Sequence, residues 1–387
     1  MTKSGVSRRI ATTIGRSWRA SRFAVKRRLG FVDPPMLMPY VGFTGRGGLW
    51  LRGRVLEDEG VVSAPHTTSA LHNLWLTFKR YETDEIAGAR VRWQAGAASG
   101  VAFSDHAGYF EVAADAAPQD HAPWMAVNLS LEHAPGYAPV TLAGEGLVRV
   151  VSPRARFVIV SDIDDTIVHT GASEIIKHWR IVTANSPESR VAFPGVAEFY
   201  RALADGEDGP ETNPIFYVSS SPWNLFDLYD RFMALRGIPR GPMLLRNLSG
   251  DGLDWILRRH NGHKVRMIEQ LLSAYPDLPF ILIGDSGQDD TSIYHDIARR
   301  FPGRILSVHI HDIGKADPAS RVGNGIGAIR DLGVPATLSR TLVDAAEVGE
   351  EMRLVASGTV EAVRLAVAAE AGSGSRAFGI YPGLPMG

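Results

Sequence analysis

The sequence lacks cysteine, long apolar runs and a strong net charge, and each of these absences excludes a class of protein. Without cysteine the chain forms no disulfide and no thiolate metal site, which fits a reducing compartment. No run of about 18 apolar residues occurs, so we expect no membrane-spanning helix. The N-terminus also lacks the continuous apolar core of a secretory signal. The net charge of −1 favours no nucleic-acid partner. We therefore expect a cytoplasmic protein.

One asymmetry is hidden by the balanced total charge. Residues 1–30 contain nine lysines and arginines and no acid. On a helix, Ile10, Ile14, Trp18 and Val25 would share one face, with most of the basic side chains elsewhere. Such a segment suits peripheral attachment to an anionic membrane surface, and a basic solvated tail is the equally weighted alternative.

The 387 residues, 45% of them hydrophobic, are enough for two or three domains with large cores. The Pro- and Gly-rich stretch 31–48 is typical of a linker or of an irregular entry into a domain, and 49–151 holds short apolar or alternating runs that predict a small antiparallel β-sandwich. From about Arg156, apolar strands alternate with helical patterns, which predicts an α/β domain with a Rossmann-like parallel sheet. The expected organisation is a basic amphipathic segment (1–30), a β-sandwich-like domain (31–152), an α/β domain (153–330), and C-terminal helices with a flexible tail (331–387).

The ends of the predicted parallel strands carry a concentration of polar residues. The apolar strand FVIVSDIDDT ends in Asp162, Asp164 and Asp165, NPIFYVSSS ends in Ser219–Ser221, and FILIGDSGQDD ends in Asp285, Asp289 and Asp290. Ligands of open parallel sheets bind beyond the carboxyl ends of the strands. Carboxylates that converge there would repel one another without a cation, and oxygen ligands favour Mg²⁺.

Carboxylates two residues apart in an extended segment point to the same side, so Asp162 and Asp164 could act on one substrate. A carboxylate nucleophile together with Mg²⁺ suits phosphoryl transfer through an aspartyl phosphate. A second carboxylate can protonate the leaving alkoxide and later activate water.

The order DxDxT, serine at a strand end, lysine and GDxxxxD resembles the haloacid dehalogenase superfamily. The resemblance covers roughly residues 155–315. It implies that Asp162 is the nucleophile, Asp164 the general acid/base, Ser219 the phosphate-binding hydroxyl and Lys264 the residue that stabilises the phosphoryl group. It also implies Mg²⁺ ligands, which we assign to Asp162, Asp164, Asp285 and Asp290. Ser220 or Ser221 stays open as an alternative to Ser219, and Asp289 as an alternative to Asp290.

Four segments resemble the catalytic domain of the actin-patch-associated phosphatidate phosphatase family more narrowly: SDIDDTI, FYVSSSPWNL, HKVRMIEQLL and GDSGQDDTSIY. This resemblance implies Mg²⁺-dependent removal of phosphate from phosphatidic acid to give diacylglycerol. A soluble phosphomonoester is the alternative substrate. A phosphatase-like scaffold, with a partner recruited by the β-sandwich, is the alternative from another class.

Other polar residues near the motifs have more ordinary interpretations. We expect Asp165 to cap the turn after the strand. His309 and His311 lie on one face of a strand that Asp312 follows, and a structural or substrate-contact role is favoured over a Zn²⁺ site. His169 and His178 follow the nucleophile motif, but nothing in the pattern assigns them a role.

Overall fold

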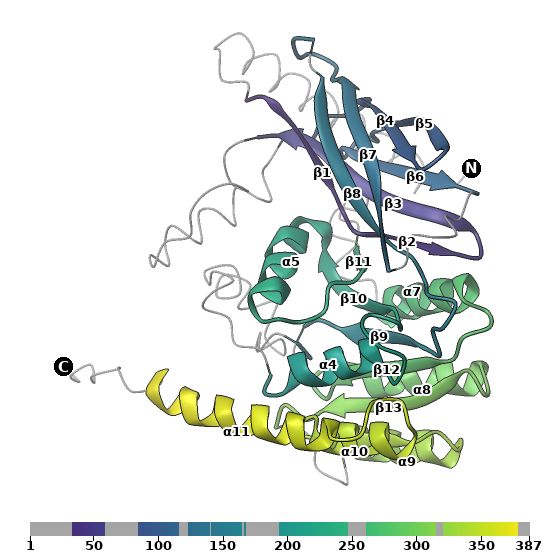
Figure 1. The fold of residues 1–387 in the computed structure, drawn as a ribbon, viewed down its shortest axis with the longest axis vertical. Helices are drawn as coiled ribbons and strands as arrows, with labels where there is room; N and C mark the ends of the chain where they lie inside the picture. Colours follow the sequence, from purple (N-terminus) through teal and green to yellow (C-terminus); the bar gives the residue numbers. More distant parts are fainter. Residues whose placement is uncertain are drawn as a thin grey trace, which may run out of the picture.

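The computed structural model of the chain describes residues 33–58, 84–115, 123–139, 141–164, 166–167, 193–246, 261–314 and 320–377. They form two sheets, one above the other in Figure 1. The upper sheet is built from the N-terminal part of the chain and the lower one from residues after 157. The basic segment 1–30, Asp165, His169 and His178 lie outside the described residues.

The N-terminal sheet has eight strands in one hydrogen-bonded network, in the order β1-β3-β2-β8-β7-β4-β5 with β6 paired to β3. All its pairs are antiparallel except β2 with β8. The sheet is therefore mixed, whereas the sequence predicted a purely antiparallel one. Alternating apolar side chains along β4, β6 and β7 face a shared core. The strands are β1 (Pro35–Pro39), β2 (Gly42–Gly45), β3 (Gly48–Glu57), β4 (Arg90–Ala95), β5 (Ala98–Phe103), β6 (Tyr109–Ala114), β7 (Trp124–His133) and β8 (Leu142–Arg149).

The second sheet is wholly parallel, and its strand order β11-β10-β9-β12-β13-β14 reads 3-2-1-4-5-6 in chain order. This order is typical of doubly wound α/β sheets, whose ligands bind where the winding direction reverses. Here the reversal falls between β9 and β12, the two strands that end in acidic motifs. The strands are β9 (Val158–Asp162), β10 (Ile215–Pro222), β11 (Met243–Arg246), β12 (Phe280–Asp285), β13 (Ile305–His311) and β14 (Ala336–Ser339).

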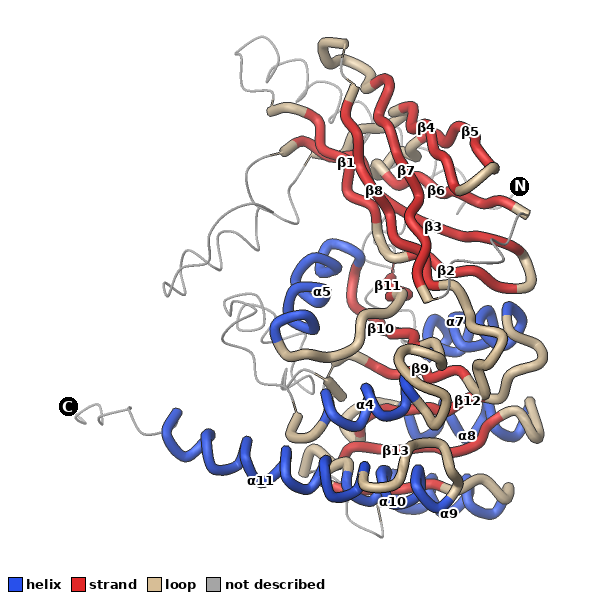
Figure 2. Tube along the Cα trace, viewed as in Figure 1, coloured by secondary structure: helices blue, strands red, loops and turns tan. Residues whose placement is uncertain are grey.

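Helices cover both faces of the parallel sheet (Figure 2). One face packs against α4, α5, α10 and α11, and the opposite face packs against α7, α8 and α9. Because both faces are buried, the strands are continuously apolar, as in FVIV and FILI. The helices are α4 (Val196–Asp205), the short 3₁₀-helix η3 (Trp223–Leu225), α5 (Phe226–Leu235), α7 (Asn261–Ala274), α8 (Asp290–Arg300), α9 (Arg321–Asp331), α10 (Val343–Glu351) and α11 (Thr359–Ala377).

Three parts of the fold differ from the expectation. The stretch 31–48, predicted as a linker or an irregular entry into the domain 31–152, contributes the regular strands β1 and β2 to the N-terminal sheet. Helix α9 and strand β14 extend the α/β unit to Ser339, beyond the predicted boundary at 330. The C-terminal helices belong to the same unit too, because Ala346 and Val363 lie in the core that covers one face of the parallel sheet.

The two sheets contact each other through hydrogen bonds as well as packing. Tyr275 donates its hydroxyl to the carbonyl of Thr44 at 2.6 Å, and Arg46 donates its amide to the carbonyl of Ala274. The buried Arg149 guanidinium donates to the carbonyl of Glu211. These bonds tie the ends of β2 and β8 to the α/β unit.

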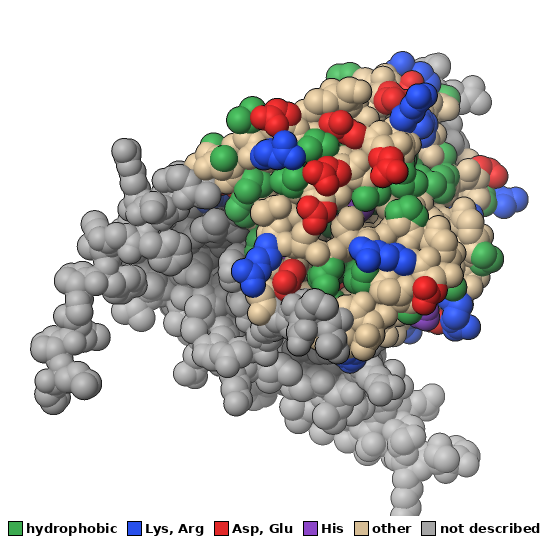
Figure 3. Space-filling model, turned by 90° about the horizontal axis from the view of Figure 1, so that it is seen from below, with side chains coloured by type: hydrophobic (Ala, Val, Ile, Leu, Met, Phe, Trp, Pro, Cys, Tyr) green, Lys and Arg blue, Asp and Glu red, His purple; other side chains and the backbone are tan. Residues whose placement is uncertain are grey.

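The lower end of the molecule shows acidic and basic side chains interspersed over its visible surface (Figure 3). Ion pairs such as Arg364 with Glu361 and Glu347 belong to helices at this end. The described part of this face therefore carries charges of both signs. Among the described helices, none combines the length and apolarity needed to cross a bilayer.

Candidate active site

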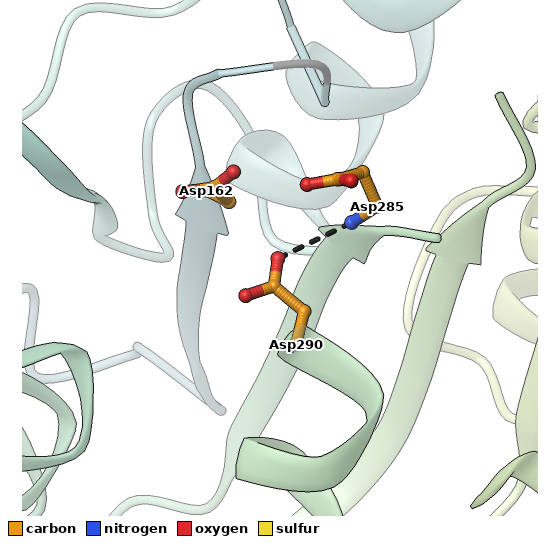
Figure 4. A group of neighbouring side chains, drawn as sticks. All are labelled: Asp162, Asp285 and Asp290. Atoms are coloured by element: carbon orange, nitrogen blue, oxygen red, sulfur yellow. Dashed lines mark hydrogen bonds between the residues drawn. The ribbon is translucent and has the colours of Figure 1, made fainter. Parts of the chain in front are cut away.

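Three buried carboxylates meet at the carboxyl end of the parallel sheet (Figure 4). Asp162 is the last residue of β9, Asp285 is the last residue of β12, and Asp290 opens helix α8. One oxygen from each lies within 4.8 Å of the others. The group lies at the winding reversal between β9 and β12, where the strand order predicts a ligand site.

One close approach and three hydrogen bonds hold the acidic turn after β12 in place. A methyl group on Gly284 would overlap the Asp290 carboxylate, so only glycine lets that side chain lie against the strand. The amide of Asp285 then donates to Asp290 Oδ2 at 3.2 Å. The amides of Gly287 and Gln288 donate to Asp285 Oδ1 at 2.6 and 3.0 Å. The GDSGQDD stretch thereby aims Asp285 and Asp290 at one place.

Lys264, in the first turn of α7, is the cation of this group. Its Nζ lies 3.0 Å from Asp162 Oδ1 and also pairs with Asp290 Oδ1. Burial disfavours the charged amine, but the carboxylates of Asp162 and Asp290 outweigh it and raise the pKa of Lys264 above its usual value. The lysine therefore stays charged.

One lysine does not balance the surrounding carboxylates. Burial raises the pKa of Asp162 well above its usual range; Lys264 opposes the rise, and Asp290, Asp285 and Asp164 add to it. The three clustered groups offer only oxygen ligands, with no sulfur or imidazole among them. This donor set fits a hard divalent cation, which would supply the missing positive charge.

Asp164 has different surroundings from Asp162 although only Ile163 separates them. Its Oδ2 accepts hydrogen bonds from Ser219 Oγ at 2.6 Å and Ser221 Oγ at 2.8 Å. Its Oδ1 accepts from the Tyr229 hydroxyl at 2.8 Å, and that hydroxyl also lies 3.0 Å from Ser221 Oγ. All three donors come from residues 219–229, the end of β10 through the first turn of α5, which we call the hydroxyl segment.

Gln288 joins the two sides of the site. Its Nε2 donates to Asp162 Oδ2 at 3.3 Å and to the carbonyl of Asp164 at 3.1 Å. Neither Gln288 nor Tyr229 was assigned a role from the sequence. Gln288 lies inside the GDSGQDD motif, which could have suggested it. Tyr229 is one position of an ordinary amphipathic helix, and nothing in the pattern distinguishes it.

The structure brings the predicted site residues together and distinguishes Asp290 from Asp289, but it does not distinguish Ser219 from Ser221. Asp162, Asp285, Asp290 and Lys264 meet at one point, whereas the Asp164 side chain faces the hydroxyl segment. Asp289 lies outside the cluster and pairs with Arg321 at 2.6 Å. Both Ser219 and Ser221 contact Asp164.

The two histidines of β13 lie on the buried face of the strand toward α4 and the segment before it. His309 lies 3.0 Å from Ser307 Oγ and 2.9 Å from Thr337 Oγ1, and its ring meets Phe199 edge-on. The His311 ring lies against that of Phe193. These contacts agree with a structural role, one of the two roles that the sequence favoured over a Zn²⁺ site.

Residues 157–312 match the family of the phosphatidate phosphatase APP1 catalytic domain. The predicted resemblance to this catalytic domain is confirmed for that segment. It contains every predicted site residue: Asp162, Asp164, Ser219, Lys264, Asp285 and Asp290.

Two curated yeast proteins are similar to the same part of the chain. The phosphatidate phosphatase APP1 of Saccharomyces cerevisiae is 35% identical over 153 residues, 39% of this chain. An uncharacterized protein of Schizosaccharomyces pombe is 29% identical over 156 residues, 40% of this chain. In each case the match spans 25% of the relative's length. The structure of a carbohydrate acetylesterase from Xanthomonas citri aligns over 85% of this chain and 76% of its own, at 10% identity. Its TM-score of 0.31 is too low to indicate a shared fold.

Proposed function

We propose that the chain is a Mg²⁺-dependent phosphatase of haloacid dehalogenase type that converts phosphatidic acid to diacylglycerol. The observation that carries the proposal is the meeting of Asp162, Asp285 and Asp290 beside Lys264 and Asp164, inside the segment similar to a phosphatidate phosphatase catalytic domain. Mg²⁺ held by the three clustered carboxylates would neutralise charge on the phosphoryl oxygens.

The first chemical step assigns different work to the two strand-end acids. The Asp162 carboxylate attacks phosphorus, and the bond between phosphorus and the ester oxygen breaks. Asp164 gives its proton to the departing alkoxide, which leaves as diacylglycerol. Lys264, in contact with Asp162, stabilises the phosphoryl group on the new aspartyl phosphate.

The second step reverses the direction of proton transfer. Asp164, now a carboxylate, takes a proton from water, and the water oxygen attacks phosphorus. The bond from phosphorus to Asp162 breaks, which releases inorganic phosphate and restores both acids. Ser219 is proposed to orient the phosphoryl oxygens, and its position 2.6 Å from Asp164 supports a place beside the reacting group.

Phosphate release by the purified protein with Mg²⁺ tests this assignment. Phosphatidic acid in mixed micelles should be compared with glycerol 3-phosphate, which has the same phosphomonoester without acyl chains. Faster release from phosphatidic acid supports the lipid assignment, and preference for the soluble ester would replace it. Failure to release phosphate from either ester would contradict the phosphatase hypothesis and favour the scaffold alternative.

The membrane-surface part of the proposal rests on the sequence of residues 1–30. Liposome flotation should compare the full chain with a chain that starts at residue 31, using anionic and neutral vesicles. We expect the full chain alone to float with anionic vesicles, and more weakly at high salt. Equal flotation of the two chains would remove this part of the proposal and leave the catalytic part standing.

A further inference from the structure

The hydroxyl segment that binds Asp164 is packed from outside by the N-terminal sheet. Immediately after Ser221 and Pro222, the chain enters η3 and α5, and Trp223 and Phe226 of these helices turn their rings toward the N-terminal sheet. In Figure 1, α5 lies directly below the β1 end of that sheet. The side chain that meets these rings is Tyr40, in the short connection between β1 and β2.

Tyr40 belongs to the core of the α/β unit although it connects two strands of the N-terminal sheet. Its ring stacks on Trp223 with centroids 4.5 Å apart and planes 19° apart, and it lies 4.6 Å from the Phe226 ring. Tyr40 and Trp223 are only 2% and 3% exposed. Stacked aromatic pairs of this kind stabilise the contact beyond the area they bury.

Two further contacts hold this aromatic platform. The Tyr40 amide donates to the carbonyl of Arg52 on β3 at 2.8 Å. The Arg52 guanidinium, itself largely buried, lies 5.3 Å from the centroid of Trp223 and 4.3 Å from that of Tyr109. A cation over an aromatic face is attracted to it, so Arg52 adds a second contact from the N-terminal sheet to Trp223.

We propose that Tyr40 is a positioning residue for catalysis, acting through Trp223 and Phe226 to hold the hydroxyl segment on Asp164. The catalytic part of this inference rests on the proposed function, whereas the packing of Tyr40 on the hydroxyl segment does not. The path is short: Trp223 is two residues from Ser221, Phe226 is three residues from Tyr229, and both Ser221 and Tyr229 donate to Asp164. The N-terminal sheet therefore supports the active site through Tyr40.

This role predicts an effect on one chemical event. If Asp164 protonates the leaving oxygen, a poorly held Asp164 harms substrates whose leaving group needs that proton. An alkyl phosphate needs it, whereas p-nitrophenyl phosphate, with its stable phenolate, needs it little. A loss that depends on the leaving group separates positioning of Asp164 from general damage to the fold.

The test compares three full-length variants by steady-state kinetics and hydrogen–deuterium exchange. Tyr40→Ala should lower kcat/KM for phosphatidic acid by roughly tenfold to 100-fold, because a misplacement of about 1 Å can cost that much. For p-nitrophenyl phosphate the loss should be under about threefold, since little proton donation is required. Tyr40→Phe keeps the ring and should restore both values.

Phe43→Ala is the matched control. Phe43 also carries an aromatic ring from the N-terminal sheet into the α/β unit, but it meets Phe216 and Tyr275 in the core on the opposite face of the parallel sheet from Trp223, Phe226 and Tyr229. It should leave the leaving-group dependence unchanged even if it lowers stability. Exchange in residues 219–229 should rise in Tyr40→Ala and stay at the wild-type level in Phe43→Ala.

The outcomes separate this inference from the proposed function. The inference is overturned if Tyr40→Ala shows wild-type hydrogen exchange in residues 219–229, or if it loses kcat/KM equally for both esters. Neither result would contradict the phosphatase assignment. If the wild-type protein releases no phosphate, the proposed function fails and the catalytic role of Tyr40 fails with it. The exchange measurement would then still decide whether Tyr40 holds the segment.

Discussion

Asp162 and Asp164 leave the same strand two residues apart, yet one lies among charges and the other among hydroxyls. Asp162 faces Asp285, Asp290 and Lys264, with a deficit of positive charge. Asp164 accepts three hydrogen bonds from neutral groups of the hydroxyl segment. The environment of each group, more than its residue type, separates the roles of paired carboxylates in an enzyme site. The charged side is suited to a cation and a phosphoryl group, and under the proposed mechanism the hydroxyl side holds the carboxylate that transfers the proton.

Removing the carboxylate on the charged side should have the largest effect. Asp162→Asn should lower kcat by a factor on the order of 10⁴ or more, because loss of a nucleophile removes the covalent route. Circular dichroism should show an intact fold. Asp289→Asn is the matched control, since Asp289 pairs with Arg321 outside the cluster, and it should keep nearly full activity. Substantial turnover by Asp162→Asn would contradict the nucleophile assignment.

Metal removal addresses the same side through stability as well as activity. EDTA should abolish phosphate release, and Mg²⁺ should restore it. Saturating Mg²⁺ at about 100 times its dissociation constant should raise the free energy of unfolding by about 3 kcal/mol. Asp290→Asn should lose this shift in thermal melts, while Asp289→Asn should retain it. An equal shift in both variants would mean that the cluster does not bind the ion.

On the hydroxyl side, removal of a single donor should be milder. Tyr229→Phe deletes one hydrogen bond to the Asp164 carboxylate and should lower kcat/KM by about tenfold or more, since bonds to charged groups contribute roughly 1.5–3 kcal/mol. Tyr217→Phe is the control: its hydroxyl donates to the carbonyl of Pro239 at 2.6 Å, away from Asp164. It should cost about 1 kcal/mol of stability without changing kcat/KM. Equal kinetic effects of the two substitutions would argue against a special role for Tyr229.

His309 extends the comparison to another buried group with hydroxyl partners, and its effect should fall on stability at low pH and not on turnover. Burial lowers the pKa of His309 from 6.5 to about 4, so the folded protein keeps it neutral while the unfolded chain takes up a proton. Its contribution to stability is therefore full above about pH 6.5 and is lost as the pH falls toward 4, by at most about 1.4 kcal/mol per pH unit.

Denaturant unfolding between pH 7 and pH 4.5 measures this contribution. His309→Gln should flatten the decline of unfolding free energy with falling pH relative to the wild-type protein. Parallel curves for wild type and His309→Gln would show that His309 contributes no pH dependence.

The sequence predicted the parts of the fold with strong local signals. FVIV and FILI are apolar throughout, as strands buried on both faces must be, and the helices after them have clear periodicity. Strands β1 and β2 were missed because their stretch is rich in Pro and Gly; pairing with β3 and β8 outweighs local preference there. Helix α9 carries three glycines, and packing on α8 stabilises what propensity does not.

The candidate site was predictable where a motif places its residues at a strand end. Asp162, Asp285 and Asp290 follow from the ends of β9 and β12, since parallel strands bring those ends to one edge. The assignment of Asp164 as a fourth metal ligand stays a prediction, and its side chain points to the hydroxyl segment in this structure. Tyr229 reaches the site from one face of α5, and Tyr40 contacts the hydroxyl segment from a sheet that is distant in sequence. Only tertiary packing specifies these two positions.

The position of a trapped phosphoryl group tests the division of roles most directly. The enzyme should be quenched during turnover, the acyl phosphate reduced with borohydride, and the modified side chain located by mass spectrometry of the peptide that contains Asp162 and Asp164. Modification at Asp162 alone is the result that the two environments predict. Modification at Asp164 would contradict the account.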